Sequence, residues 1–159
     1  MLPREAAIKA SDAVKLIADT SIITHGATRW NSNYDAVKRL LQIGAKLNDV
    51  CQAANTPEFK KSKLECLHEY VSIMQPVAAA LDKLQGEIKA AYFGNILPTL
   101  HMLQTKLQSM QHNMLKHCEP LVVVLLEGFE RRFDKELKLS GAASDKTIGA
   151  ISHPYFKLR

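Results

Sequence analysis

The residues of this chain that could bind a metal or take part in catalysis are six histidines, three cysteines and scattered carboxylates. The histidines and cysteines form neither a His-Glu-x-x-His motif nor a Cys-x-x-Cys pair. Cys66 and His68 are too close in sequence for both side chains to reach one metal from a helix. The adjacent side chains of His117 and Cys118 diverge for the same reason. We therefore expect no metal site and no cofactor.

Carboxylate pairs at helical spacing, such as Glu65 with Glu69 and Glu127 with Glu130, have lysine or arginine close by. This arrangement is typical of a solvated helix face rather than of general acid–base catalysis. The chain also lacks the glycine-rich phosphate-binding motifs and the Gly-x-Ser-x-Gly nucleophile motif. We therefore expect no catalytic residue and no enzymatic activity from this chain by itself.

The run Thr28–Asp35 is the most informative stretch, because it holds the only tryptophan beside an arginine at a predicted helix start. The ring of Trp30 could stack on an unpaired base, an interaction of roughly 1–3 kcal/mol per base. The Arg29 guanidinium could contact a phosphate, and free N–H groups at a helix start favour an anion. A tryptophan in this position is more often a core anchor, although the polar neighbours Asn31 and Ser32 suit an exposed edge. The residues alone leave both interpretations open.

Composition places the chain among globular helical proteins. Its 159 residues fit one domain with a sizeable core, and 47% of them are hydrophobic. Only 7 glycines and 6 prolines argue against a turn-rich β fold. The formal charge of +5 permits phosphate contacts but does not by itself indicate nucleic acid.

Cysteine usage and hydropathy indicate a soluble intracellular protein. Cys51, Cys66 and Cys118 are odd in number and widely spaced, so we expect reduced, buried thiols. The N-terminus turns polar at once, which is unlike a signal peptide. No apolar run approaches the roughly 20 residues that span a bilayer, so we expect no membrane association.

Apolar residues at helical spacing predict an all-α fold arranged as a multi-helix bundle. Helices are expected over residues 4–19, 33–54, 57–74, 77–84, 96–114 and 120–139. Ser32 with Asp35 resembles a capping box for the second of these helices. Pro76 is expected to break or kink the chain after residue 74, and Ser140–Ser144 to form a linker.

One apolar stripe is unusually regular. Its members are spaced 4, 3, 4, 3 and 4 residues apart: Ile96, Leu100, Leu103, Leu107, Met110 and Met114. This is a heptad pattern. It predicts either core packing against a neighbouring helix or a short seam for self-association or a helical protein partner.

Four landmarks occur in the order shown by hAT-type transposases and the proteins derived from them. They are Thr28–Ser32 with Tyr34 and Lys38–Leu41; Glu69–Tyr70, Pro76 and Leu81–Glu87; Ile96–Leu100; and Arg131–Phe133 with Ile151–Lys157. Each landmark alone is only weakly specific for this family. The four together are a strong indication, because they occur in the family's order and span residues 28–159. The chain therefore resembles the helical insertion domain of an hAT transposase or of a transposase-derived, BED zinc-finger-like protein. His153 and Tyr155 replace the Asp and Arg of the family pattern.

The resemblance implies a helical insertion within a ribonuclease-H-like catalytic domain that uses an Asp-Asp-Glu metal triad. It implies that Trp30 stabilises a flipped base, with Arg29 beside it. Asn31 and Ser32 join them as expected DNA contacts, and Lys38 and Arg39 follow as candidate phosphate contacts. The two catalytic Asp residues would precede this chain and the Glu would follow it.

Three parts are expected: a helical lead-in over 1–27, an insertion-type domain over 28–139, and a linker with a truncated element over 140–159. The family's Cys-x-x-His element, BED zinc finger and C-terminal dimerisation segment are missing from the sequence. The expected function is DNA binding in the nucleus without catalysis by the chain alone. The alternatives are a helical protein-interaction scaffold of a domesticated transposase and a fragment of an active DNA transposase.

Overall fold

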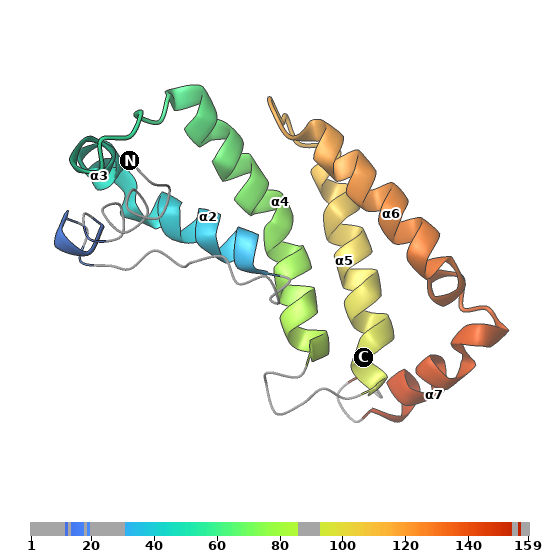
Figure 1. The fold of residues 1–159 in the computed structure, drawn as a ribbon. Helices are drawn as coiled ribbons and strands as arrows, with labels where there is room; N and C mark the ends of the chain where they lie inside the picture. Colours follow the sequence, from blue (N-terminus) through green and yellow to red (C-terminus); the bar gives the residue numbers. More distant parts are fainter. Residues whose placement is uncertain are drawn as a thin grey trace. The chain divides into compact units, whose positions relative to one another are not determined.

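The computed structural model describes residues 12, 14–17, 19, 31–85, 93–153 and 156. Within these residues the secondary structure consists of α-helices and short 3-10 helices, without a strand (Figure 1). The predicted all-α class is therefore confirmed. The chain forms two compact units, Met1–Val71 and Ser72–Arg159, called here the N-terminal and the C-terminal unit. The predicted division at residues 27 and 139 stays a prediction.

The N-terminal unit contains α2 (Ser32–Ile43), the 3-10 helix η1 (Gly44–Lys46), α3 (Leu47–Ala53) and the start of α4 (Lys61–Gln85). The single helix predicted over 33–54 is wrong, because Gly44 adopts a positive φ of 59° that ends α2. A glycine takes this conformation without the steric cost of a Cβ. Of the predicted first helix, residues 12 and 14–17 are described, and they are helical.

The core of the N-terminal unit includes buried Val14 and Val50, with Ile17 and Ile43 packed against them. Further buried apolar side chains come from α2, α3 and the turn after α3: Tyr34, Leu47, Cys51 and Ala54. The helical spacing of Leu47, Val50 and Cys51 puts one face of this short helix into the core. The core therefore lies where α2 and α3 meet the residues around Val14.

Helix α4 runs without interruption from Lys61 to Gln85, so the break predicted at Pro76 is wrong. A proline inside a helix removes one backbone hydrogen bond. Pro76 is nevertheless buried, as are Ile73 and Ala80 three residues before and four residues after it. The continuous buried face they form offsets the lost hydrogen bond. The helix also begins at Lys61, four residues later than predicted.

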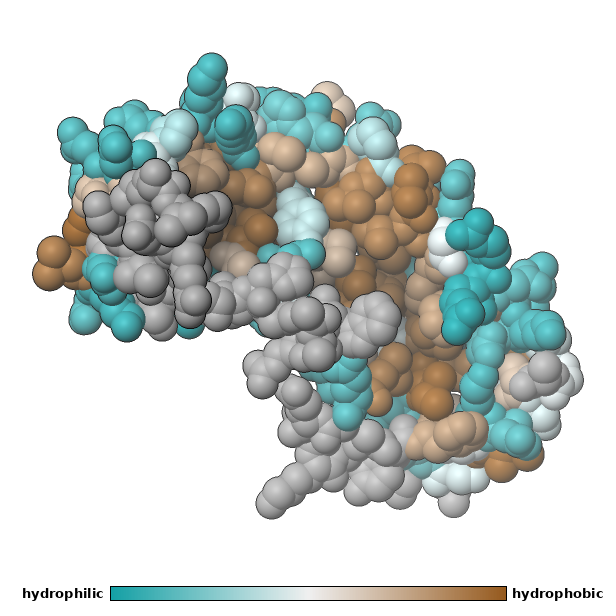
Figure 2. Space-filling view, viewed as in Figure 1, coloured by the Kyte–Doolittle hydropathy of each residue, from teal (hydrophilic) through white to brown (hydrophobic). Residues whose placement is uncertain are grey.

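The C-terminal unit contains the remainder of α4, η2 (Phe93–Asn95), α5 (Ile96–Met110), α6 (Glu119–Leu137), η3 (Gly141–Ala143) and α7 (Ser144–Ser152). Helix α5 packs against α6, and α7 packs against both η2 and α5. Figure 2 shows apolar side chains over α5 and the side of α6 that faces it, with polar side chains along the outer edge of α6. The unit is thus a small helical cluster built around α5.

The regular stripe is part of this cluster. Leu100, Leu103 and Leu107 are buried, which agrees with core packing. Met114 lies beyond the end of α5 at Met110 and is 99% exposed. Most of the stripe therefore packs in the core of the C-terminal unit. Met114 does not take part in this packing, because α5 ends before it.

The linker predicted over Ser140–Ser144 is also wrong, since η3 and the start of α7 occupy it. Lys146 of α7 forms an ion pair with Glu136 of α6. The Ser140 hydroxyl donates a hydrogen bond to the Lys135 carbonyl oxygen, at 3.1 Å. These contacts, together with packing of α7 on η2, hold a segment whose small residues alone suggest a flexible connection.

Candidate nucleic-acid interface

The central pair of the predicted interface, Arg29 with Trp30, falls outside the residues that the structure describes. The next described residue is Asn31, which occupies the N-cap position of α2. The Asp35 N–H donates to the Asn31 carbonyl oxygen at 2.9 Å, which closes the first turn. The signature in the sequence therefore leads directly into a helix N-terminus.

Asn31 and Ser32 differ in how much of their side chains reaches solvent. Asn31 is half-buried, whereas Ser32 is only 6% exposed and is the first residue of α2 rather than its cap. The predicted capping box with Ser32 as the cap is therefore wrong, because the helix starts one residue earlier than that motif requires. Of these two predicted DNA contacts, Asn31 presents the larger surface to a ligand.

Lys38 and Arg39 lie on different sides of α2, because adjacent helical residues are about 100° apart. The Lys38 side chain is exposed, and its Nζ lies 5.4 Å from the centroid of the Tyr34 ring one turn earlier. An ammonium over an aromatic face is favoured by roughly 0.5–1 kcal/mol at exposed sites. Tyr34 itself is buried, so it holds Lys38 against the surface. This leaves a positioned cation available on the outside of α2.

Arg39 is half-buried, so less of its side chain reaches solvent than that of Lys38. Its side chain lines a largely apolar pocket together with Thr56 and Phe59 from the turn and segment after α3. The two basic residues that the sequence groups together therefore meet different surroundings. Only Lys38 is placed like a typical surface phosphate contact.

A further basic run, missed by the sequence interpretation, precedes and begins α4. Lys60, Lys61 and Lys63 are exposed, and the first turn of α4 carries no acidic residue. The pattern Lys-Lys-x-Lys shortly after Pro57 is the sequence signal from which this basic cluster could have been predicted. Glu58 and Glu65 flank it in the sequence, so it is a short cluster and not a continuous basic surface.

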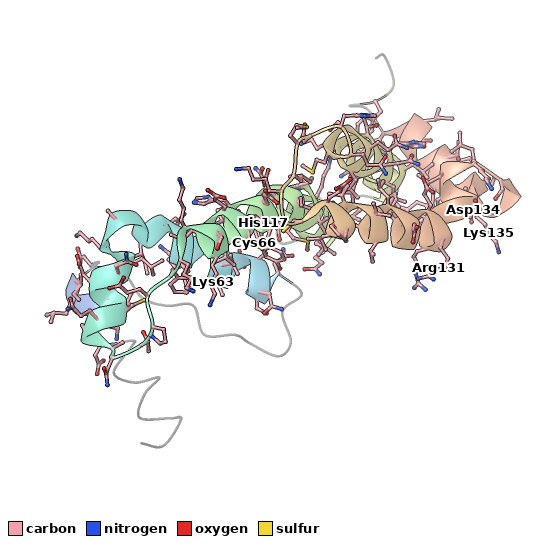
Figure 3. The ribbon with its side chains drawn as sticks, turned by 90° about the horizontal axis from the view of Figure 1, so that it is seen from above. Lys63, Cys66, His117, Arg131, Asp134 and Lys135 are labelled. Carbon is pink, nitrogen blue, oxygen red and sulfur yellow. The ribbon has the colours of Figure 1, made fainter. Side chains whose placement is uncertain are left out.

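The basic landmark near the end of α6 is interleaved with acidic groups. Near the C-terminal end of α6, the side chains of Arg131, Asp134 and Lys135 are exposed on the surface of the helix (Figure 3). The Lys138 Nζ lies 2.5 Å from an Asp134 carboxylate oxygen, and this hydrogen bond raises the pKa of Lys138. This ion pair therefore offsets the positive charge of Lys138.

Metal-ligating side chains do not gather into a site among the described residues. No group of three or more His, Cys, Asp or Glu in this part of the chain is placed to hold a metal ion. Cys51 and Cys118 are buried thiols, as predicted, and Cys66 is half-buried. Burial raises the pKa of the Tyr70 hydroxyl on α4 above its ordinary value of 10.0.

No helix within the described residues combines the length and hydropathy needed to cross a bilayer. Comparison of the chain with protein-family models, with curated proteins and with solved structures found no match.

Proposed function

We propose that this chain is a DNA-binding helical domain of the hAT insertion type that acts in the nucleus and is not catalytic alone. One observation carries the proposal. The Arg29–Trp30 signature immediately precedes α2, whose surface then presents Lys38 about two turns further along. An aromatic side chain, a helix N-terminus and a positioned cation are the groups that bind an unpaired base and the adjoining phosphates.

Trp30 and Arg29 supply base stacking and a phosphate contact in this proposal. Asn31 contributes hydrogen bonds at the start of α2, and Lys38 contributes a second phosphate contact. Other parts of a larger protein would recognise the DNA sequence, because phosphate contacts and stacking discriminate little between bases.

The experiment compares two fluorescent DNA hairpins, one with an unpaired base near its duplex end and one fully paired. The full chain is expected to bind the first more tightly at low salt. Trp30→Ala is expected to weaken that binding by about tenfold, because stacking contributes roughly 1–3 kcal/mol per base. Trp30→Phe retains an aromatic face and serves as the matched control. Equal affinity of Trp30→Ala and the wild-type chain would sink the proposal, as would the absence of binding at low salt.

The alternative function, a protein-interaction scaffold, is favoured by the modest net charge of +5 and by the regular apolar stripe. Leu103 and Leu107 of that stripe are buried within the C-terminal unit. Aspartate substitutions at these positions would therefore disturb folding rather than a partner surface. The stripe no longer favours a protein partner over DNA.

A further inference from the structure

We propose that Thr56 is a phosphorylation site for a proline-directed protein kinase, and that the phosphate group releases the segment after α3 from the end of that helix. Thr56 and Pro57 form the only Ser/Thr-Pro pair in the sequence. They lie between α3 and α4, where residues 56–60 form neither helix nor turn (Figure 1). Both residues are exposed.

The surroundings of Thr56 suit a kinase better than those of other exposed threonines. A protein kinase binds its substrate as a non-helical segment, and exposed loops provide such segments. A proline-directed kinase selects a residue without a backbone N–H directly after the target, which only proline supplies. Thr105 is also exposed, but it lies inside α5, is followed by lysine, and its hydroxyl donates to the His101 carbonyl oxygen at 3.0 Å. Thr105 is therefore a matched control within the same chain.

The modification transfers the γ-phosphoryl group of ATP to Oγ1 of Thr56. The bond between the γ-phosphorus and the oxygen that bridges it to the β-phosphate is broken, and a bond from phosphorus to Oγ1 forms. The hydroxyl proton passes to a base of the kinase, and ADP leaves. The product is a phosphate monoester with a charge of about −1.5 to −2 at pH 7.

The Thr56 hydroxyl currently fastens its segment to the end of α3. It donates to the Cys51 carbonyl oxygen at 3.2 Å, and the Thr56 N–H donates to the same oxygen at 2.9 Å. Cys51 lies in the last turn of α3. After phosphorylation Oγ1 has no proton to donate, and a negatively charged group stands beside that carbonyl oxygen. Repulsion of this kind disfavours a phosphate at the C-terminal end of a helix, so the segment is expected to leave it.

The start of α4 offers the phosphate a more favourable position. Lys60 and Lys61 follow Thr56 by four and five residues and are exposed, and the first turn of α4 carries no acidic residue. The Leu64 N–H donates to the Lys60 carbonyl oxygen at 3.1 Å, so the helix starts beside these lysines. Lysines and a helix N-terminus both favour a phosphate. Glu58 is the one carboxylate between Thr56 and Lys60, and it is exposed to solvent, which weakens its repulsion.

The first experiment incubates the full chain with Mg²⁺, ATP and either a cyclin-dependent or a mitogen-activated protein kinase. Mass spectrometry is expected to find one phosphate per chain, on Thr56, and none on Thr105. Pro57→Ala is expected to slow the reaction severalfold, because the residue after Thr56 then has an N–H group. An unrelated Thr-Pro substrate peptide shows that each kinase is active.

The second experiment examines the phosphorylated chain by hydrogen exchange and ³¹P NMR. Amide exchange in α3 is expected to accelerate severalfold, while that in α5 stays unchanged. The pKa of the phosphate should lie below that of phosphothreonine in the Thr-Pro peptide. Lys60→Gln and Lys61→Gln should each raise it, whereas Lys106→Gln, on exposed α5 surface, should not. Thr56→Val removes only the hydroxyl donor and should accelerate exchange in α3 less than phosphorylation does.

Three results would overturn the proposal. The first is an unmodified Thr56 under conditions in which the Thr-Pro peptide is fully phosphorylated. The second is an equal rate for Pro57→Ala and the wild-type chain. The third is a phosphorylated chain with unchanged exchange in α3 and an ordinary phosphate pKa. No DNA is present in these measurements, so their outcome is independent of the proposed DNA binding.

Discussion

Gly94 of η2 approaches Gly149 of α7 so closely that a Cβ atom on Gly94 would lie 2.4 Å from the Gly149 carbonyl oxygen. A Cβ atom on Gly149 would in turn lie 2.8 Å from Cδ1 of Phe93. Both separations are below 3.0 Å, which is shorter than the non-bonded contacts that Cβ atoms make in proteins. The absence of a side chain at these two positions therefore allows α7 to pack on η2.

Gly94→Ala is expected to destabilise the C-terminal unit. The added methyl group meets backbone atoms of α7, which cannot move aside as a flexible side chain could. Overpacking of this kind costs about 1–3 kcal/mol. Urea unfolding followed by circular dichroism is the measurement.

Gly128→Ala is the control for that substitution. Gly128 lies within α6, and a Cβ atom built there meets no heavy atom within 4 Å. Alanine in the interior of a helix is about 0.5–1 kcal/mol more stable than glycine. Equal stability of the two variants would contradict the close packing of η2 and α7.

Leu107→Ala is expected to lower the free energy of unfolding by about 2–5 kcal/mol, because it leaves a cavity. The Leu107 side chain is 1% exposed and belongs to the regular stripe on α5. Met102→Ala on the same helix, where the side chain is 40% exposed, should cost much less. Thermal unfolding and light scattering together distinguish core packing from a partner seam. A stable Leu107→Ala variant that loses self-association would favour the seam instead.

The ion pair between Glu136 and Lys146 makes stability depend on pH. The hydrogen bond from Lys146 lowers the pKa of Glu136 below its ordinary value of 4.5. A carboxylate with a lowered folded-state pKa contributes stability that is fully present above the unfolded value. That contribution is lost as the pH falls from 4.5 through the lower folded-state pKa.

Urea midpoints measured between pH 7 and pH 3 test this dependence. Glu136→Gln should lower the midpoint at neutral pH and remove part of the decrease below pH 4.5. Glu130→Gln changes an exposed carboxylate on the same helix and should leave the profile close to that of the wild-type chain. Identical profiles for Glu136→Gln and the wild-type chain would rule out a stabilising ion pair.

Lys38→Gln is expected to weaken DNA binding equally for different DNA sequences, since a phosphate contact carries no base information. The slope of log affinity against log salt should decrease in magnitude by about one, as one counterion fewer is released. Lys106→Gln removes an exposed cation from α5 and is the control. Fluorescence anisotropy at several salt concentrations gives both slopes, and an unchanged slope for Lys38→Gln would exclude this contact.

The candidate interface was predictable only in part. The sequence places a helix start directly after Arg29 and Trp30, and α2 begins there. The sequence predicts the same role for Lys38 and Arg39 because they are neighbours. In the structure Lys38 is exposed, whereas Arg39 is half-buried and lines an apolar pocket. Which of two adjacent residues faces inward depends on what packs against the helix.

The sequence by itself determined the all-α class and the inward face of α5, because the apolar spacing of Leu100, Leu103 and Leu107 is a local property of one helix. Tertiary structure decided where the helices begin and end. Helix α4 continues through Pro76 because the residues around this proline are buried. Helix α2 ends where Gly44 adopts a positive φ. The helix that follows Ser140 is stabilised by its packing on η2. Local preferences of this kind amount to about 1–3 kcal/mol at a single residue, which long-range packing readily outweighs.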